Sequence, residues 1–153
     1  MPVLSAGLLV HRVGPSGREV LIVHPGGPFW ARKDLGAWSI PKGEHPPDED
    51  ARAAAHREFR EELGLAPPEG EEHYLGERRQ PSGKRLSVWA IEGDLDLSST
   101  CSNEVTMECP RGSGRMLTFP EVDRAEWFDL AEARLRLLRG HVPFLDDLLA
   151  KVS

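Results

Sequence analysis

The chain has 153 residues, of which 39% are hydrophobic and 29% are charged, and its formal net charge is −6. A chain of this length is expected to form one domain over residues 1–153, and no apolar run approaches the ~20 residues that a membrane-spanning helix needs. The acidic charge argues against long nucleic acid as a partner, because binding to a phosphate backbone needs a basic face.

The N-terminal segment predicts a β-hairpin. Residues 1–4 carry neither the basic segment nor the apolar core of a signal peptide, which favours a cytoplasmic location. The aliphatic run 5–13 and the compact apolar run 19–24 are separated by the turn sequence Gly-Pro-Ser-Gly at 14–17. Two apolar runs on either side of such a turn indicate paired antiparallel strands.

A loop and a short strand are expected next. Residues 24–30 contain two prolines and two glycines, so this segment is predicted to be a loop that presents Phe29 and Trp30. Residues 38–40 predict a short strand, and the sequence Pro-Lys-Gly at 41–43 predicts a turn.

Residues 48–63 predict a helix. Acidic residues occupy its expected first turn, alanines occupy its middle, and no glycine or proline interrupts it. Gly64 stands where a helix commonly ends in a residue of left-handed conformation.

The second half of the chain predicts further strands and two helices. Strands are expected at 73–78, 84–91 and 124–128, with another candidate at 104–109 followed by a loop at 110–114. Asp129 and Glu132 form a capping-box pattern for a helix that ends at Gly140, and a last helix is expected from Pro143 to Leu149. This order of strands and helices indicates an α/β (α+β) fold, in which helices cover the faces of one mixed sheet.

The cysteines and histidines offer no covalent catalytic group. Cys101 and Cys109 match neither a metal-ligand pair nor a disulfide framework, and reduced thiols are expected. The six histidines are scattered along the sequence, and no Ser-His-Asp or Cys-His arrangement stands out.

Three glutamates of the predicted helix share one face. At 3.6 residues per turn, Glu58, Glu61 and Glu62 fall within an arc of roughly 100°. Like charges at this spacing repel one another, and Glu61 and Glu62 also lie near the negative end of the helix dipole. A positive group is therefore expected against this face, unless the three side chains simply form an acidic face exposed to solvent, which is the more common situation for glutamates.

The rest of the same helix suits such a site. The glutamate arc also contains Ala51, Ala54 and Ala55, which are small enough for a ligand or a neighbouring loop to approach closely. Phe59 and Leu63 point the other way and are expected to anchor the helix to the core. A cluster of carboxylate oxygens suits Mg²⁺, with Mn²⁺ as a substitute, rather than Zn²⁺, which prefers histidine and cysteine.

The segment from Gly43 to Leu65 resembles the complete Nudix box, Gly-x5-Glu-x7-Arg-Glu-U-x-Glu-Glu-x-Gly-U, in which U is apolar. Every specified position is matched, from Gly43 and Glu49 through the run Arg57-Glu58-Phe59-Arg60-Glu61-Glu62-Leu63-Gly64-Leu65. Phe59 is bulkier than the usual aliphatic residue at its position. The resemblance implies a mixed β-sheet sandwiched between helices, and it covers most of the chain.

The resemblance also implies roles for the residues of the box. Glu61 and Glu62 would bind the metal directly, and Glu58 would be either a metal ligand or the base that activates water. Glu49 and Arg57 would form a salt bridge that positions the helix. Gly43 would be needed for the shape of the backbone, with a main-chain carbonyl at or beside it facing the metal.

Residues outside the box complete the expected site. Glu121 is the candidate for a late metal ligand because of its spacing to Glu126 and Trp127, and Glu104 and Glu108 compete with it for this role. Lys42 is a candidate for binding a phosphate of the substrate. Three aromatic residues are candidates for stacking on a base, with core packing expected for at least one of them: Trp30, Trp38 and Phe29.

The expected function is hydrolysis of a phosphoanhydride bond in a nucleoside diphosphate linked to another group. The substrate would be a nucleoside triphosphate or a dinucleoside polyphosphate, with metal ions supporting in-line attack by water. Two alternatives stay open: a hydrolase of oxidised or noncanonical deoxynucleotides or of nucleotide sugars, and a nucleotide-binding regulatory module without catalysis. The protein is expected to be a monomer or a homodimer.

Overall fold

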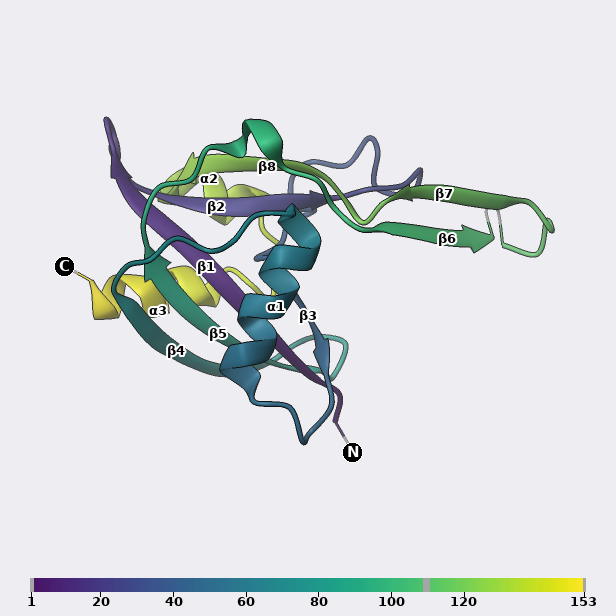
Figure 1. Ribbon diagram of the computed structural model, residues 1–153. Coiled ribbons are helices and arrows are strands. Elements are labelled where there is room, and N and C mark those ends of the chain that lie inside the picture. The colour runs from purple at the N-terminus through teal and green to yellow at the C-terminus, as the bar shows by residue number, and fades with distance from the viewer. Residues whose placement is uncertain (1, 109–110, 153) are drawn as a thin grey trace.

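The computed structural model describes residues 2–108 and 111–152, and within them a six-stranded mixed sheet, a separate two-stranded sheet and three α-helices (Figure 1). The strands are β1 (Leu4–Gly14), β2 (Gly17–Pro25), β3 (Lys42–His45), β4 (Glu72–Arg79), β5 (Arg85–Glu92), β6 (Glu104–Glu108), β7 (Met116–Pro120) and β8 (Val122–Asp129). The helices are α1 (Ala51–Leu63), α2 (Leu130–Arg136) and α3 (Pro143–Lys151), with a 3₁₀ turn, η1 (Leu97–Ser99).

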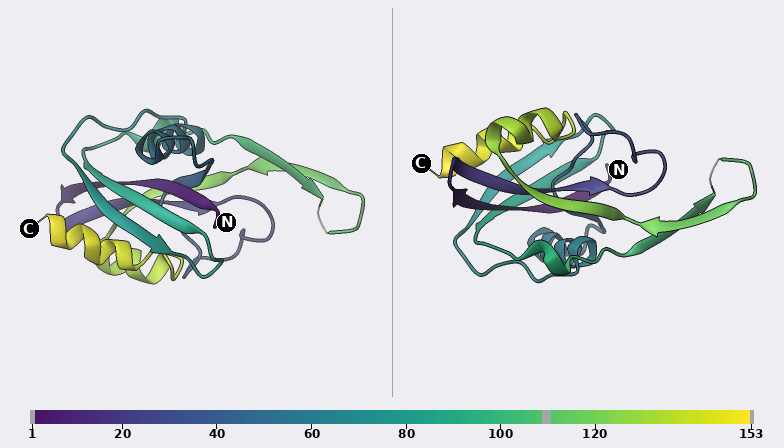
Figure 2. Two further views of the ribbon diagram at one scale, coloured as in Figure 1. Left: turned by 90° about the horizontal axis from the view of Figure 1, so that it is seen from below. Right: turned by 90° about the horizontal axis from the view of Figure 1, so that it is seen from above.

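The main sheet has the order β4-β5-β1-β2-β8, and β3 pairs with the beginning of β1. β1 and β5 are parallel, whereas the other pairs are antiparallel. Helix α1 lies on one face of this sheet, and α2 and α3 lie on the other (Figure 2). The predicted α/β (α+β) class, with a mixed sheet between helices, is confirmed.

Both faces of the sheet are buried, which explains the unbroken aliphatic runs of β1 and β2. In β1, Leu8 and Val10 pack in the cluster that contains α1, while Leu9 packs in the cluster that contains α2 and α3. Each such leucine or valine stabilises the fold by about 1.5–3 kcal/mol when it is fully removed from water. The two cores fix α1 against the sheet, and α1 carries most of the candidate site.

Helix α1 begins and ends at residues with distinct capping interactions. The side chain of Asp50 accepts a hydrogen bond of 3.0 Å from the backbone N–H of Ala53, so the helix begins at Ala51 and not at the predicted Asp48. The acidic residues expected in the first turn therefore precede the helix. Gly64 ends it as predicted, with φ of 68° and its N–H bonded to the carbonyl of Arg60.

The buried face of α1 includes two of the alanines from the glutamate arc. Phe59 and Leu63 are fully buried, which confirms them as anchors. Ala54 and Ala55 are also fully buried, in the same cluster as the strand residues Ala6 and Leu8 and their neighbours. The close approach that these small side chains allow is that of the sheet, so the expectation that they make room for a ligand or a loop is wrong.

Two predictions around residues 38–45 also need correction. The expected strand at 38–40 makes only isolated bridges, from Ser39 to Val23 and from Trp38 to Leu137. The expected turn at 41–43 instead leads directly into β3, which pairs with β1 in the register Gly7 opposite Lys42. Proline and glycine suggested a local turn, but pairing with a distant strand determines the structure here.

The C-terminal part follows the prediction with shifted boundaries. The Asp129 side chain accepts a hydrogen bond of 2.8 Å from the N–H of Glu132, which confirms the cap of α2. Helix α2 ends at Arg136 and not at Gly140, because Leu137 turns to pair with Trp38. Helix α3 runs to Lys151, two residues beyond the predicted end.

The strand predicted at 104–109 forms as β6 (Glu104–Glu108), while its partner β7 was not predicted. The expected end of this strand at Cys109 and the expected start of the loop at Pro110 lie outside the described residues, as does the thiol of Cys109. Cys101 is an exposed free thiol. Over the described part of the chain, every helix is too short or too polar to span a membrane.

Candidate active site

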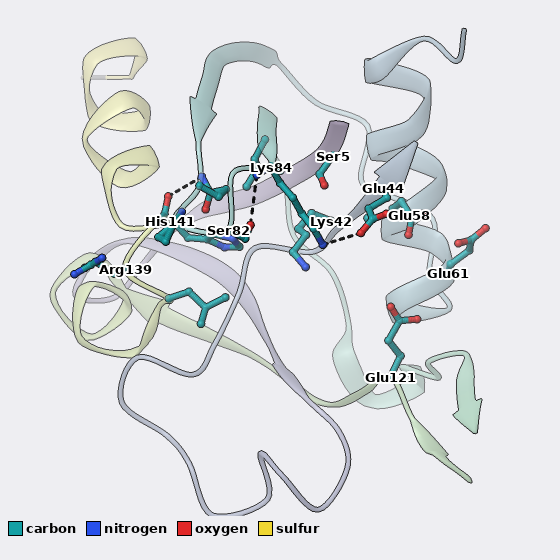
Figure 3. A pocket seen from close by; sticks show the side chains of 16 residues that line it. Ser5, Lys42, Glu44, Glu58, Glu61, Ser82, Lys84, Glu121, Arg139 and His141 are labelled. Atoms are coloured by element: carbon teal, nitrogen blue, oxygen red, sulfur yellow. Dashed lines mark hydrogen bonds and ion pairs between the residues drawn. The ribbon is translucent and has the colours of Figure 1, made fainter. Parts of the chain in front are cut away.

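A cavity of about 750 Å³ opens between the N-terminal end of β1, strand β3, helix α1 and the turn between β4 and β5 (Figure 3). The segment before β8 and the segment between α2 and α3 complete its wall. Its lining residues are Ser5, Lys42, Gly43, Glu44, Glu58, Glu61, Gln80, Pro81, Ser82, Lys84, Leu86, Glu121, Leu138, Arg139, Gly140 and His141. Carboxylates gather at one end, and the segment 138–141 forms the other.

Gly43 provides the space for the carboxylate of Glu58. A Cβ atom added to Gly43 would collide with the carboxyl group of Glu58, whereas the backbone of Gly43 is not in the left-handed region. Gly43 was expected to be needed for the shape of the backbone, but its own conformation does not require a glycine. A side chain is excluded at this position because β3 and α1 approach each other closely.

Arg57 connects the acidic residues of the box. Its guanidinium donates two hydrogen bonds to Glu49, of 2.9 and 3.0 Å, in a bidentate arrangement. The same guanidinium donates to Glu58 at 2.9 Å and to Glu61 at 3.2 Å. Arg57 thus holds the middle of α1 to the loop before it and partly neutralises two of the three shared-face glutamates.

Glu58 and Glu61 both line the cavity, but their environments differ. Glu61 is about two fifths exposed, whereas the side chain of Glu58 is only 12% exposed. Burial first, and then the negative charge of Glu61, raise the pKa of Glu58 above its ordinary value. Glu121 contributes to the same shift, so a third carboxylate faces this end of the cavity.

Glu62 lies beneath the cavity and is not part of its lining. It is 6% exposed, and its Oε1 accepts a hydrogen bond of 3.2 Å from the backbone N–H of Lys42. Burial raises its pKa to about 8, with the charge of Glu121 acting in the same direction. Two of the three helix glutamates thus face the cavity, and the third supports the beginning of β3.

Glu121 is the one of the three late-ligand candidates that lines the cavity. Its backbone is fixed on both sides, since its N–H donates to the carbonyl of Asn103 and its carbonyl accepts from the N–H of Gly26. Glu104 lies opposite Pro120 in the β6–β7 hairpin. Glu108 lies farther along that hairpin and accepts backbone hydrogen bonds from Gly112 and Gly114.

Positive charge is also present in the cavity. Lys42 and Arg139 have no carboxylate oxygen within 4.0 Å among residues 2–108 and 111–152, while Lys84 is paired with Glu44 at 2.7 Å. Lys42 is drawn between the carboxylates and His141 in Figure 3. The structure therefore brings the predicted Lys42 into the cavity with Glu58, Glu61 and Glu121.

The aromatic candidates are placed elsewhere. Trp38 is fully buried, its indole donates to Asp34 at 2.7 Å, and its ring packs edge-on against Phe128. Trp38 cannot stack on a base, so its assignment as a substrate-binding residue is wrong, and the core packing expected for at least one of the three aromatic residues is confirmed. Trp30 packs partly against the core and edge-on against exposed Phe29, and neither residue lines the cavity.

Several cavity residues were not predicted from the sequence. His141 is buried, and its Nδ1 accepts a hydrogen bond of 3.1 Å from the N–H of Ile40, while burial lowers its pKa to about 3. The side-chain amide of Gln80 donates to the carbonyl of Gly140 at 3.1 Å. These contacts join segments far apart in the sequence, and no local motif marks them.

The residues present fit a divalent metal in chemical type and in location. Within the described ranges, no three His, Cys, Asp or Glu side chains already converge on one point. However, the side chains of Glu58, Glu61 and Glu121 offer only oxygen atoms, come from α1 and from the residue between β7 and β8, and face one end of the cavity, where their charges oppose one another. Such a set suits a hard cation, with Arg57 occupying part of the space between the carboxylates.

A comparison with protein families matches residues 1–151 to the NUDIX domain. The chain therefore belongs to the NUDIX family, and the resemblance of residues 43–65 to the Nudix box is confirmed. No match was found among curated proteins.

Comparison with solved structures finds the same fold at low sequence identity. The NUDIX domain of Shewanella oneidensis NrtR, complexed with ADP ribose, is 16% identical, with a TM-score of 0.68 over 100% of this chain and 90% of that chain. A C. elegans Ap4A hydrolase in a binary complex is 18% identical, with a TM-score of 0.61 over 97% of each chain. The E. coli ORF135 protein is 23% identical, with a TM-score of 0.58 over 97% of this chain and 89% of that chain.

Proposed function

We propose that this protein is a Mg²⁺-dependent pyrophosphohydrolase that cleaves a phosphoanhydride bond in a nucleoside polyphosphate. The observation that carries the proposal is the meeting of Glu58, Glu61 and Glu121 with Lys42 in one cavity of about 750 Å³. A cavity of this size suits a nucleotide-sized ligand. The proposal is supported by the residue types, because carboxylate oxygens suit a divalent metal and the ammonium group of Lys42 can bind a phosphate.

The metal would be held by the carboxylates of Glu58, Glu61 and Glu121 and by that of Glu62 beneath them, whose charge interacts with those of Glu58 and Glu121. The main chain of Gly43 would be adjacent. A bound divalent ion would neutralise the diphosphate oxygens and make water a better nucleophile. Mn²⁺ would fit the same oxygen ligands. Arg57 would hold the carboxylates in place, in the manner of its present hydrogen bonds to Glu49 and Glu58.

Glu58 can act either as the base that activates water or as a metal ligand. Its raised pKa makes it a stronger base than an exposed glutamate, so its carboxylate can accept a proton from the attacking water. Its oxygen atoms can equally bind the metal. Lys42 would bind a phosphate oxygen and stabilise the negative charge that develops on the leaving group.

The names of the related structures suggest two kinds of nucleotide substrate, a dinucleoside polyphosphate and ADP ribose. One is named an Ap4A hydrolase, and the other is a complex with ADP ribose. Lys42 and Arg139 provide positive charge in the middle and at the far end of the cavity, which favours a phosphate chain over the neutral sugar of ADP ribose. Nucleoside triphosphates and dinucleoside polyphosphates are therefore the first candidates.

The proposal is tested by incubating the protein with Mg²⁺ and a panel of nucleotides and separating the products by chromatography. The panel contains nucleoside triphosphates, diadenosine polyphosphates, oxidised deoxynucleotides and ADP ribose. We expect cleavage that depends on the added metal and is fastest with a chain of three or more phosphates. Tight binding of a nucleotide without turnover at any metal concentration would instead identify a nucleotide-binding module.

A further inference from the structure

Strands β6 and β7 form an arm that extends away from the rest of the domain (Figures 1 and 2). The arm consists of residues 104–108 and 116–120, which form a two-stranded sheet separate from the main sheet. An isolated two-stranded hairpin is at best marginally stable in water. A feature of this kind is expected to gain stability from a surface that covers it.

One face of the arm is entirely apolar. Val105 lies opposite Phe119, and Met107 lies opposite Leu117, so these alternate pairs share a face. Between them, Thr106 and Thr118 share a hydrogen bond of 2.7 Å on the opposite face. Met107 is 51% exposed and Leu117 is 41% exposed, so this apolar face is open to solvent.

The apolar face continues onto the domain at the base of the arm. The ring of Phe119 lies beside Gly27, where an added Cβ would come within 2.6 Å of the ring. Phe29, two residues further along, is 68% exposed. An exposed apolar surface such as this face of the arm usually marks an interaction site.

The charges along the arm are segregated. Arg111 and Arg115 stand at its tip, and neither has a carboxylate oxygen within 4.0 Å in the described part of the chain. One acidic residue, Glu108, also stands there and accepts hydrogen bonds from the backbone of Gly112 and Gly114, so the tip keeps a net positive charge. Acidic residues stand at its base, namely Glu104, Glu121 and Asp123. At the base these three acidic residues outnumber the one neighbouring cation, Arg124. The arm therefore has a net positive tip and a net negative base, and it is apolar in between on one face.

We propose that the arm binds the same arm of a second copy of this chain, face to face and in opposite directions. A twofold axis through the middle of the arm places Val105 over the partner's Met107 and Leu117 over the partner's Phe119. The same axis places the basic tip of each arm over the acidic base of the other, so the charges are complementary. The parallel arrangement would bring like charges together and is disfavoured.

The first test measures the mass in solution by light scattering coupled to gel filtration, over a range of protein concentrations. The wild-type protein is expected to reach twice the 17.0 kDa of one chain. Leu117→Lys places a charge on the apolar face and is expected to give a monomer. Met116→Lys, on the adjacent residue of the same strand but on the other face, is the matched control and is expected to remain a dimer.

Both substitutions are at exposed positions, so both variants are expected to fold, which a thermal unfolding curve would check. Charge reversal gives an independent test. The double variant Arg111→Glu/Arg115→Glu is expected to weaken the dimer at least tenfold at low salt, and adding Glu104→Arg is expected to restore part of the loss. A wild-type mass of one chain at every concentration, or an unchanged dimer in Leu117→Lys, would overturn the proposal.

Discussion

Gly43 and Glu58 are in such close proximity that the first residue has room only for a hydrogen atom where the second places its carboxylate. They lie on different elements, β3 and α1, and both line the cavity. The glycine of the Nudix box therefore sets the position of a glutamate fifteen places further along the same motif. This relationship leads directly to a double-mutant experiment.

The first prediction concerns Gly43→Ala. The added methyl group must displace the Glu58 carboxylate, so we expect turnover to fall by about tenfold or more and the protein to lose about 1–3 kcal/mol of stability. In a Glu58→Ala background the collision is absent, and the same substitution is expected to cost much less. Chemical denaturation of the four proteins in this cycle measures the coupling. Equal costs in both backgrounds would show that the two residues act independently.

The second prediction concerns the roles of Glu61 and Glu62. Glu61→Gln and Glu62→Gln are each expected to lower kcat by about 10²-fold or more, because a neutral amide is a poor ligand for a divalent ion. Both variants are expected to keep the fold, since glutamine retains an oxygen that can accept the Lys42 N–H at position 62. Calorimetric titration with Mn²⁺ would report the loss of metal binding.

Glu69→Gln, an exposed glutamate outside the cavity, is the matched control and is expected to leave both kcat and Mn²⁺ binding unchanged. Near-normal turnover in both Glu61→Gln and Glu62→Gln would remove these residues from the metal site. Loss in Glu61→Gln alone would show that Glu62 acts only as a support for β3.

The third prediction concerns the guanidinium group of Arg57 and its hydrogen bonds. Lysine keeps the charge but cannot donate to Glu49 in a bidentate manner while also reaching Glu58. We therefore expect Arg57→Lys to lower kcat by about tenfold with a much smaller change in KM, because the carboxylates are misplaced while substrate binding persists. The stability cost is expected to be about 1 kcal/mol, since the side chain is 40% exposed.

Arg60→Lys serves as the control for this substitution. Arg60 is exposed on the same helix, and within residues 2–108 and 111–152 it has no carboxylate oxygen within 4.0 Å. It is expected to leave kcat and stability unchanged. If Arg57→Lys and Arg60→Lys behave alike, Arg57 does not position the site.

Much of the sheet and all of the box could be predicted from the sequence, for a physical reason. Within the runs 5–13 and 19–24, residues 5–11 and 20–24 are buried on both faces of the sheet, so their apolar composition alone marks them as strands. The spacing of Glu58, Glu61 and Glu62 follows from helix geometry, and Gly64 ends the helix because it alone tolerates the left-handed conformation there. In each case the information is local.

The remaining features depend on contacts between distant parts of the chain. Residues 41–43 lead into a strand because β1 is beside them, and Trp38 is buried because Phe128 and Asp34 surround it. The far wall of the cavity joins Gln80 to Gly140, sixty residues apart. The sequence pattern does not determine which distant segments pair. The types of residue in the site could therefore be predicted from the sequence, whereas their positions in the cavity could not.

The fourth prediction concerns stability in acid and the buried His11 of β1. Its Nδ1 accepts a hydrogen bond of 2.8 Å from Arg18, while its Nε2 has no hydrogen-bond partner among the described residues. Burial first, and then the charge of Arg18, lower the pKa of His11 to about 4, whereas Glu92 and Glu71 act in the opposite direction. Protonation is therefore much easier in the unfolded chain than in the folded protein.

The sign of the pH effect follows from this difference. Between pH about 6.5 and about 4, the unfolded chain binds a proton at His11 that the folded protein does not, so the free energy of unfolding falls as the pH is lowered through this window. In His11→Gln the contribution of this residue, on the order of 2–3 kcal/mol at its maximum, is expected to disappear. Denaturation with urea at several pH values would measure the reduced slope. Ser87→Ala is the control, because Ser87 is also buried in the sheet but does not titrate, and this variant is expected to lower the free energy of unfolding equally at every pH. If the pH slope of His11→Gln equals that of the wild-type protein, other groups cause the acid sensitivity.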